Sequence, residues 1–251
     1  MFAEYQKSRF SSDAMDGKPA GYDVYSKGEG PVIVLIQELP GIGPETLRLA
    51  DKLVAAGFRV VMPHLFGPLG RLSFAGNAVR LFCMRREFSL FARKSSSPIV
   101  LWLKALCRHV RDEYDVSGVG VIGMCLSGNF AISLMADENV LAGVASQPSL
   151  PLFAPSSLHM SDREIAAARL RLEEHGPMLA YRFEDDKLCT ASKFDALDAA
   201  FNDDQQRISL KTLPGNKHAV LTVHFVDQEG SPTHDALNEI IGYFKGKLAA
   251  A

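Results

Sequence analysis

The sequence lacks any apolar run long enough to cross a membrane, although 47% of its 251 residues are hydrophobic. A membrane-spanning helix needs roughly 20 consecutive apolar residues, and no stretch approaches that length. Residues 1–17 are polar and mixed in charge, and they lack the apolar segment of a secretion signal. We therefore expect a cytoplasmic protein with no membrane partner.

An excess of charge of one sign is also absent. The chain has 27 Lys and Arg residues against 29 Asp and Glu residues, which gives a formal net charge of -2. Strongly basic surfaces are what attract nucleic acids and anionic membranes. The balance gives no reason to expect a nucleic acid as partner.

Cysteines are few and widely separated. The four are Cys83, Cys107, Cys125 and Cys189, and no two of them form a Cys-x-x-Cys pair. That spacing argues against a zinc site, and a disulfide framework is uncommon in a long chain without a secretion signal. We therefore expect reduced thiols, no metal and no cofactor.

Strand patterns alternate with helical patterns along most of the chain. Aliphatic and β-branched runs predict strands at 31–37, 58–62, 119–122, 140–145, 178–183 and 208–213. Apolar residues spaced three or four apart predict helices at 45–56, 126–135, 191–201 and 232–244. Residues 72–110 have no strand pattern and are expected to form a helical insert over the sheet. The alternation predicts one α/β domain, 1–251, with a doubly wound, mostly parallel sheet.

The segment Gly123-Met124-Cys125-Leu126-Ser127-Gly128 follows the strand at 119–122 and precedes a helix. A nucleophile on such a sharp turn needs small residues two positions before and after it, and Gly123 and Ser127 occupy those positions. The helix N-terminus would favour thiolate over thiol at Cys125. We therefore favour Cys125 as a nucleophile over a buried structural cysteine. Ser127 is a weaker candidate because Cys125 and Asn129 would then occupy the small positions.

An acidic loop follows the strand at 178–183. It contains Glu184, Asp185 and Asp186, any of which could orient a histidine and stabilise its protonated form. Asp186 is favoured over Asp185, but an acidic turn in solvent is an alternative interpretation.

His218 follows the strand at 208–213 in a Gly- and Asn-containing turn. The order Cys125, Asp186, His218 is the chain order nucleophile, acid, histidine of α/β-hydrolase enzymes. That order favours a general base at His218 over a histidine exposed on a loop. His224 is a weaker rival because it lies beyond the turn.

The loop after the strand at 31–37 begins with Glu38 and Leu39. In this architecture that loop supplies one backbone N–H that stabilises an oxyanion, here from Leu39, and the second comes from the residue after the nucleophile, here Leu126. Glu38 lies between a buried strand and an apolar loop, where an unpaired carboxyl has a raised pKa. A glutamate facing solvent is an equally good interpretation.

These segments together resemble the dienelactone hydrolase family. The resemblance runs from about residue 21 to 244 and is carried by the cysteine turn, the Gln37-Glu38-Leu39-x-Gly41 segment, the strand Gly57–Pro63 and the Asp186…His218 pair. It implies an α/β-hydrolase fold and hydrolysis of a small ester or lactone through a Cys-His-Asp triad and an acyl-enzyme. It also implies that the glutamate interacts with the resting cysteine and helps it to lose its proton.

The sequence departs from the family after His218. The family carries an arginine there to hold a substrate carboxylate, whereas residues 219–222 are Ala-Val-Leu-Thr. Arg85 and Arg86 in the predicted insert could supply a cation, or lie on a solvated helix face. Two other functions stay open: a catalytically weak family member that binds a small metabolite or partner, and a redox-sensing thiol resolved by Cys189.

Overall fold

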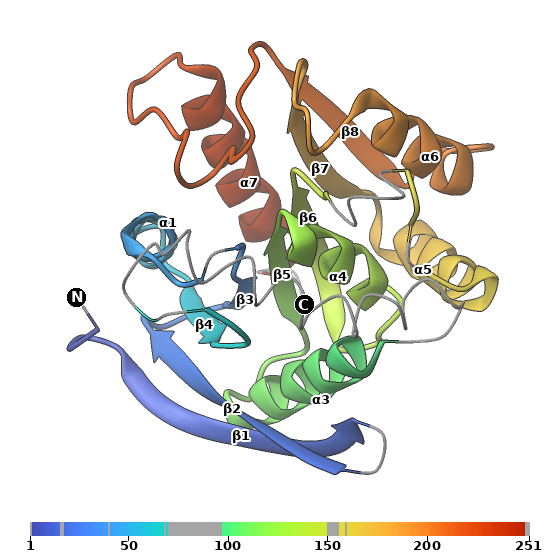
Figure 1. The fold of residues 1–251 in the computed structure, drawn as a ribbon. Coiled ribbons are helices and arrows are strands. Elements are labelled where there is room, and N and C mark those ends of the chain that lie inside the picture. Colours follow the sequence, from blue (N-terminus) through green and yellow to red (C-terminus); the bar gives the residue numbers. More distant parts are fainter. Residues whose placement is uncertain are drawn as a thin grey trace.

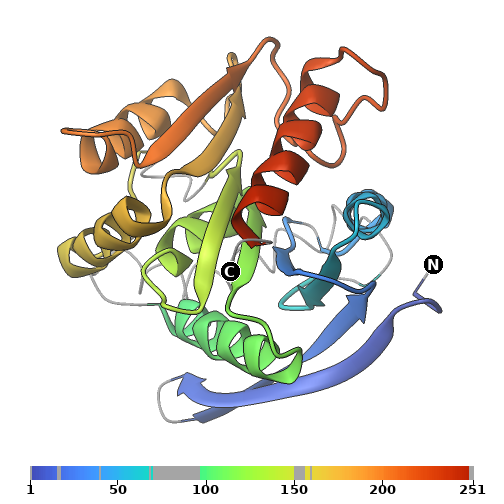
Figure 2. The same cartoon turned by 180° about the vertical axis from the view of Figure 1, so that it is seen from behind.

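The computed structural model describes residues 2–15, 18–39, 41–67, 69, 97–149, 156–158 and 160–248. These residues form one eight-stranded sheet covered by helices on both faces (Figures 1 and 2). The strands are β1 (Gln6–Met15), β2 (Lys18–Lys27), β3 (Val32–Ile36), β4 (Arg59–Pro63), β5 (Val119–Met124), β6 (Val140–Ser146), β7 (Met178–Phe183) and β8 (Ile208–Leu213).

The strand order is β1-β2-β4-β3-β5-β6-β7-β8. Neighbouring strands in the sheet order β4-β3-β5-β6-β7-β8 are parallel, whereas the β1–β2 and β2–β4 pairs are antiparallel. The doubly wound, mostly parallel sheet predicted from the sequence is therefore confirmed. The carboxyl ends of the six parallel strands meet at one edge, where open α/β sheets bind their ligands.

Strand β3 shows why the parallel strands have few polar residues. All five of its residues are buried, with Val32, Val34 and Ile36 packed in one core and Ile33 and Leu35 in the other. A strand covered on both faces cannot alternate apolar and polar side chains, so it appears in the sequence as a continuous aliphatic run.

Helices cover the two faces of the sheet. One face packs against α1 (Pro44–Ala55) and α7 (Pro232–Leu248). The other packs against α3 (Pro98–Glu113), α4 (Leu126–Leu134), α5 (Asp162–His175) and α6 (Ala191–Phe201). In the part of the chain that the structure describes, no helix is long and apolar enough to span a membrane.

The antiparallel ribbon of β1 and β2 was not anticipated from the sequence. The ribbon forms the edge of the sheet, and many of its residues are polar and exposed. Trp102 of α3 packs edge-on against Phe10 and Tyr22 of the ribbon and donates its indole N–H to the carbonyl of Ala20 at 3.0 Å.

Most of the predicted 72–110 insert lies outside the described residues. Residues 98–110 belong to α3, whose Trp102, Leu103 and Leu106 are fully buried in the core beneath the sheet. Helix α5 was not predicted, although Ser161 and Glu164 form a capping box at its start.

Candidate active site

Cys125 lies on the turn between β5 and α4, with backbone angles φ 57° and ψ -119°. A residue with a side chain rarely adopts this conformation, and residues that do so cluster at functional sites. The two glycines beside it allow the turn to be tight. A Cβ on Gly123 would lie 2.0 Å from the carbonyl oxygen of Ser127, and one on Gly128 would lie 2.9 Å from Cα of Pro148.

Ser127 has a structural role in this turn. It is fully buried, and its hydroxyl accepts a hydrogen bond from the N–H of Met124 at 2.8 Å and lies 2.9 Å from the carbonyl oxygen of Ile36. The hydroxyl therefore joins the ends of β3 and β5. Cys125 lies at the tip of this turn, directly before the first residue of α4.

The sulfur of Cys125 is confined by polar neighbours. The residue is 6% exposed, and its Sγ lies 3.1 Å from Oγ of Ser149, which follows β6. The backbone N–H of Ser149 also donates to the carbonyl of Cys125 at 3.1 Å, so both a side-chain and a backbone contact join the two residues. Cys189, by contrast, is fully buried and burial raises the pKa of its thiol, which suits it poorly to resolve a sulfenic acid.

Asp186 and His218 form a direct pair. Oδ2 of Asp186 lies 2.7 Å from Nδ1 of His218, and Oδ1 accepts hydrogen bonds from the N–H groups of Leu188 at 2.8 Å and Cys189 at 3.0 Å. Asp186 is 4% exposed, whereas Asp185 is exposed to solvent. Asp186, the buried aspartate of the acidic loop, is therefore the carboxylate that bonds to His218.

His224 supports the loop of His218. Its Nδ1 accepts hydrogen bonds from the backbone N–H groups of His218 at 3.4 Å and Ala219 at 3.0 Å. Both contacts fix the backbone on which the His218 ring is mounted. Burial lowers the pKa of His224, which keeps its ring neutral and able to accept these bonds.

The electrostatic environment of His218 favours its imidazolium form. Burial by itself lowers the pKa of His218, but the hydrogen bond to Asp186 and the interaction with the Cys125 sulfur raise it to about 10. Nε2 is buried and makes no hydrogen bond of standard geometry among the described residues, so it is the ring atom left for the sulfur. Asp186 and the Cys125 sulfur thus both favour the protonated form of the ring.

Glu38 lies at the end of β3 and is 6% exposed. The hydroxyl of Thr222 donates to its Oε1, and the amide Nε2 of Gln147 donates to its Oε2 at 3.2 Å. Burial raises the pKa of Glu38, while Thr222, the charge of His218 and Gln147 oppose that rise. The carboxyl therefore bonds to Thr222 and Gln147 in this structure, and not to Cys125.

The two expected oxyanion donors lie in the segments that follow β3 and β5. The N–H of Leu126 belongs to the first turn of α4, where no helical carbonyl accepts from it. Leu39 is half-buried in the loop after β3. Arg85 and Arg86 lie outside the described residues. Within those residues, no group of three or more His, Cys, Asp or Glu side chains could hold a metal ion.

Sequence reasoning missed three residues of this site, namely Ser149, Gln147 and Thr222. Ser149 and Gln147 follow β6, a strand end at which no candidate was predicted. Their position at the carboxyl end of a parallel strand is the signal that could have identified them. Thr222 had no such signal, because it lies in an apolar segment and its partner Glu38 is 184 residues away.

A family model matches this site and most of the chain. The model of the dienelactone hydrolase family covers residues 20–248. A carboxymethylenebutenolidase from Rhodococcus opacus is 28% identical over 130 residues, which are 52% of this chain and 48% of that protein. The match thus spans about half the length of that relative.

Solved structures with low sequence identity share the fold. The structure named m3DLH has a TM-score of 0.66 at 18% identity and covers 98% of this chain and 100% of its own. A dienelactone hydrolase-like promiscuous phosphotriesterase from metagenomic libraries has a TM-score of 0.65 at 13% identity, with 98% and 99% covered. A cold-adapted esterase from an Arctic intertidal metagenomic library has a TM-score of 0.63 at 15% identity, with 98% and 95% covered.

Proposed function

This chain belongs to the dienelactone hydrolase family, and we propose that it hydrolyses a small ester or lactone with Cys125 as nucleophile. The observation that carries the proposal is the 2.7 Å pair of Asp186 and His218 beside the cysteine of a strained strand–helix turn. The name of the Rhodococcus relative supports the same reaction class.

In the proposed first step the Cys125 thiolate attacks the carbonyl carbon and forms a tetrahedral oxyanion. The backbone N–H groups of Leu39 and Leu126 would donate hydrogen bonds to that oxygen. The C–O bond of the ester then breaks, and the His218 imidazolium gives its proton to the departing alkoxide. Asp186 stabilises the imidazolium and keeps Nδ1 protonated.

In the second step the thioester is hydrolysed. Neutral His218 takes a proton from water, and the resulting hydroxide attacks the thioester carbonyl. Collapse of the second oxyanion breaks the C–S bond and restores the thiolate beside the imidazolium. The proposal includes a reducing, cytoplasmic location, which suits the free thiols of Cys107, Cys125 and Cys189.

Turnover of p-nitrophenyl acetate and of a dienelactone tests the nucleophile. We expect Cys125→Ala to abolish turnover of whichever compound the wild type hydrolyses, and Cys125→Ser to be strongly impaired. Cys189→Ser is the matched control, because it replaces another buried thiol near the site and should keep activity. Equal rates for the wild type and Cys125→Ala would end the proposal.

A mass measurement of the trapped intermediate gives independent support. Brief reaction with p-nitrophenyl acetate followed by acid quenching should leave an acetyl group on the peptide that contains Cys125. The same treatment of Cys125→Ala should leave that peptide unmodified.

A further inference from the structure

The buried carboxyl of Glu38 depends on two neutral partners. Thr222 donates to one oxygen and Gln147 donates to the other at 3.2 Å, and both partners are fully buried. A carboxyl removed from water carries a negative charge only when its neighbours stabilise that charge. The hydrogen bonds from these two side chains therefore favour the charged form of Glu38.

Gln147 also connects Glu38 to the histidine loop. Its side-chain oxygen accepts a hydrogen bond from the N–H of Val220 at 3.2 Å and another from the hydroxyl of Ser146. With its oxygen occupied in this way, the amide must present its NH₂ group to Glu38. The backbone of Gln147 has φ 37°, a conformation that persists at a non-glycine residue when its surroundings impose it.

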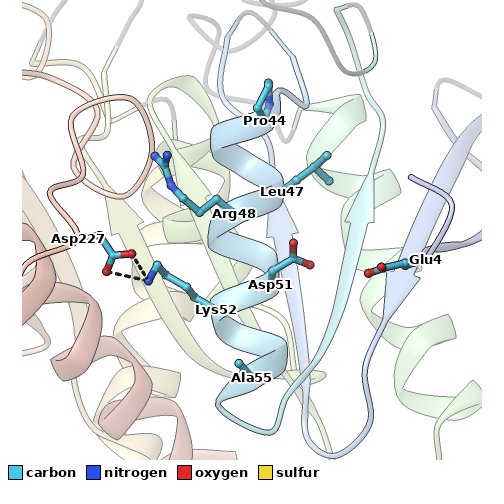
Figure 3. A pocket seen from close by; sticks show the side chains of 8 residues that line it. All are labelled: Glu4, Pro44, Leu47, Arg48, Asp51, Lys52, Ala55 and Asp227. Atoms are coloured by element: carbon cyan, nitrogen blue, oxygen red, sulfur yellow. Dashed lines mark hydrogen bonds and ion pairs between the residues drawn. The ribbon is translucent and has the colours of Figure 1, made fainter. Parts of the chain in front are cut away.

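Helix α1, outside the site, holds the loop of Thr222 in place. Its carbonyl accepts a hydrogen bond from Arg48 of α1 at 3.0 Å. Lys52, one turn further along α1, pairs with Asp227 of the same loop at 2.7 Å. Figure 3 shows this ion pair bridging α1 and the loop, with Arg48 on the same helix. The Thr222 hydroxyl is therefore anchored on a well-supported backbone.

We propose that Gln147 and Thr222 are positioning residues that fix Glu38 against the His218 loop and set its charge during the reaction. This inference rests on the proposed function of the site. The charged groups that act on Glu38 are His218, which attracts its carboxylate, and Glu45 in the first turn of α1, which repels it. An ionised Glu38 therefore favours the imidazolium of His218, and through it the thiolate of Cys125.

Carboxyl ¹³C NMR of the full-length protein, labelled at glutamate side chains, tests the proposal directly. The Glu38 signal is assigned by its absence in Glu38→Gln. Thr222→Ser keeps the hydroxyl and should titrate like the wild type. Thr222→Val keeps the shape but leaves one carboxyl oxygen unpaired, so its Glu38 midpoint should move to higher pH.

Gln147→Glu provides a second, independent variant. It keeps an oxygen for the N–H of Val220 but brings a second carboxyl against Glu38, so the midpoint should rise further than in Thr222→Val. In ester hydrolysis, kcat of Thr222→Val should fall by about tenfold with little change in KM, and the acidic limb of its pH profile should move upward. Thr222→Ser should restore both.

Identical Glu38 midpoints in the wild type, Thr222→Val and Gln147→Glu would overturn the proposal, as would an equal displacement in Thr222→Ser. If Thr222→Val does not fold, Gln147→Glu decides by the same criterion. Because the NMR titration needs no turnover, it separates failure of this inference from failure of the hydrolase proposal, which the activity of Cys125→Ala tests.

Discussion

Replacement of Asp186 by asparagine should disable the site while leaving its shape almost unchanged. The carbonyl oxygen of the new side chain can still accept from the backbone N–H groups of Leu188 and Cys189, which Oδ1 does now. The amide NH₂ then faces Nδ1 of His218, so Nδ1 must become an acceptor. The proton of the neutral ring moves to Nε2, which can no longer take a proton from a thiol or from water.

The size of the effect follows from the charge on His218. Its pKa of about 10, against an ordinary value of 6.5, corresponds to roughly 5 kcal/mol in favour of the imidazolium. The hydrogen bond to Asp186 is the largest of the contributions that raise this pKa. Without it the pKa of His218 should fall toward 6.5, and kcat/KM should drop on the order of 10³- to 10⁴-fold.

Two measurements check this prediction. Histidine NMR titration from about pH 6 to about pH 10 reports the protonation of His218, and p-nitrophenyl acetate hydrolysis over the same range reports kcat/KM. Asp185→Asn is the matched control, because Asp185 is the exposed neighbour on the same loop and should behave like the wild type. Wild-type activity in Asp186→Asn, or an equal loss in Asp185→Asn, would refute the reasoning.

Three further predictions concern the turn, the sulfur and the response to pH. Gly123→Ala should lower the free energy of unfolding by about 3 kcal/mol or more in urea titrations, because its Cβ would lie 2.0 Å from a backbone oxygen of α4. Ser149→Ala should slow alkylation of Cys125 by iodoacetamide near neutral pH, because the hydroxyl 3.1 Å from the sulfur is lost, whereas Ser133→Ala removes a buried hydroxyl of α4 without effect. Since the pKa of His218 is raised in the folded protein, its contribution to stability should be complete below about pH 6.5 and lost as the pH rises through about 10. Urea titrations of the wild type and His218→Gln should therefore converge at high pH, and a constant difference would contradict the assignment.

The sequence alone was sufficient to predict several local parts of this protein. The continuous aliphatic run of β3 predicted a strand buried on both faces, and the structure buries all five of its residues. The small residues around Cys125 predicted a sharp strand–helix turn, and the backbone there has φ 57°. These predictions succeed because periodicity and turn chemistry act within a few residues of the chain.

Only the tertiary structure decided which side chains meet. Asp185 and Asp186 are adjacent and chemically alike, and the turn after β7 alone determines that Asp186 reaches His218 while Asp185 remains in solvent. The edge ribbon of β1 and β2 was likewise not predicted. Its Phe10 and Tyr22 pack against Trp102, which is far from them in the sequence, so no local pattern indicates this contact.

The partners of Glu38 show the same limit at longer range. Gln147 lies 109 residues away from Glu38 along the chain, and Thr222 lies 184 residues away. Their contacts depend on the order of β3, β5 and β6 in the sheet and on the support of the Thr222 loop by α1. No local pattern encodes these distances, because strand order is a property of the packed sheet and not of any single segment.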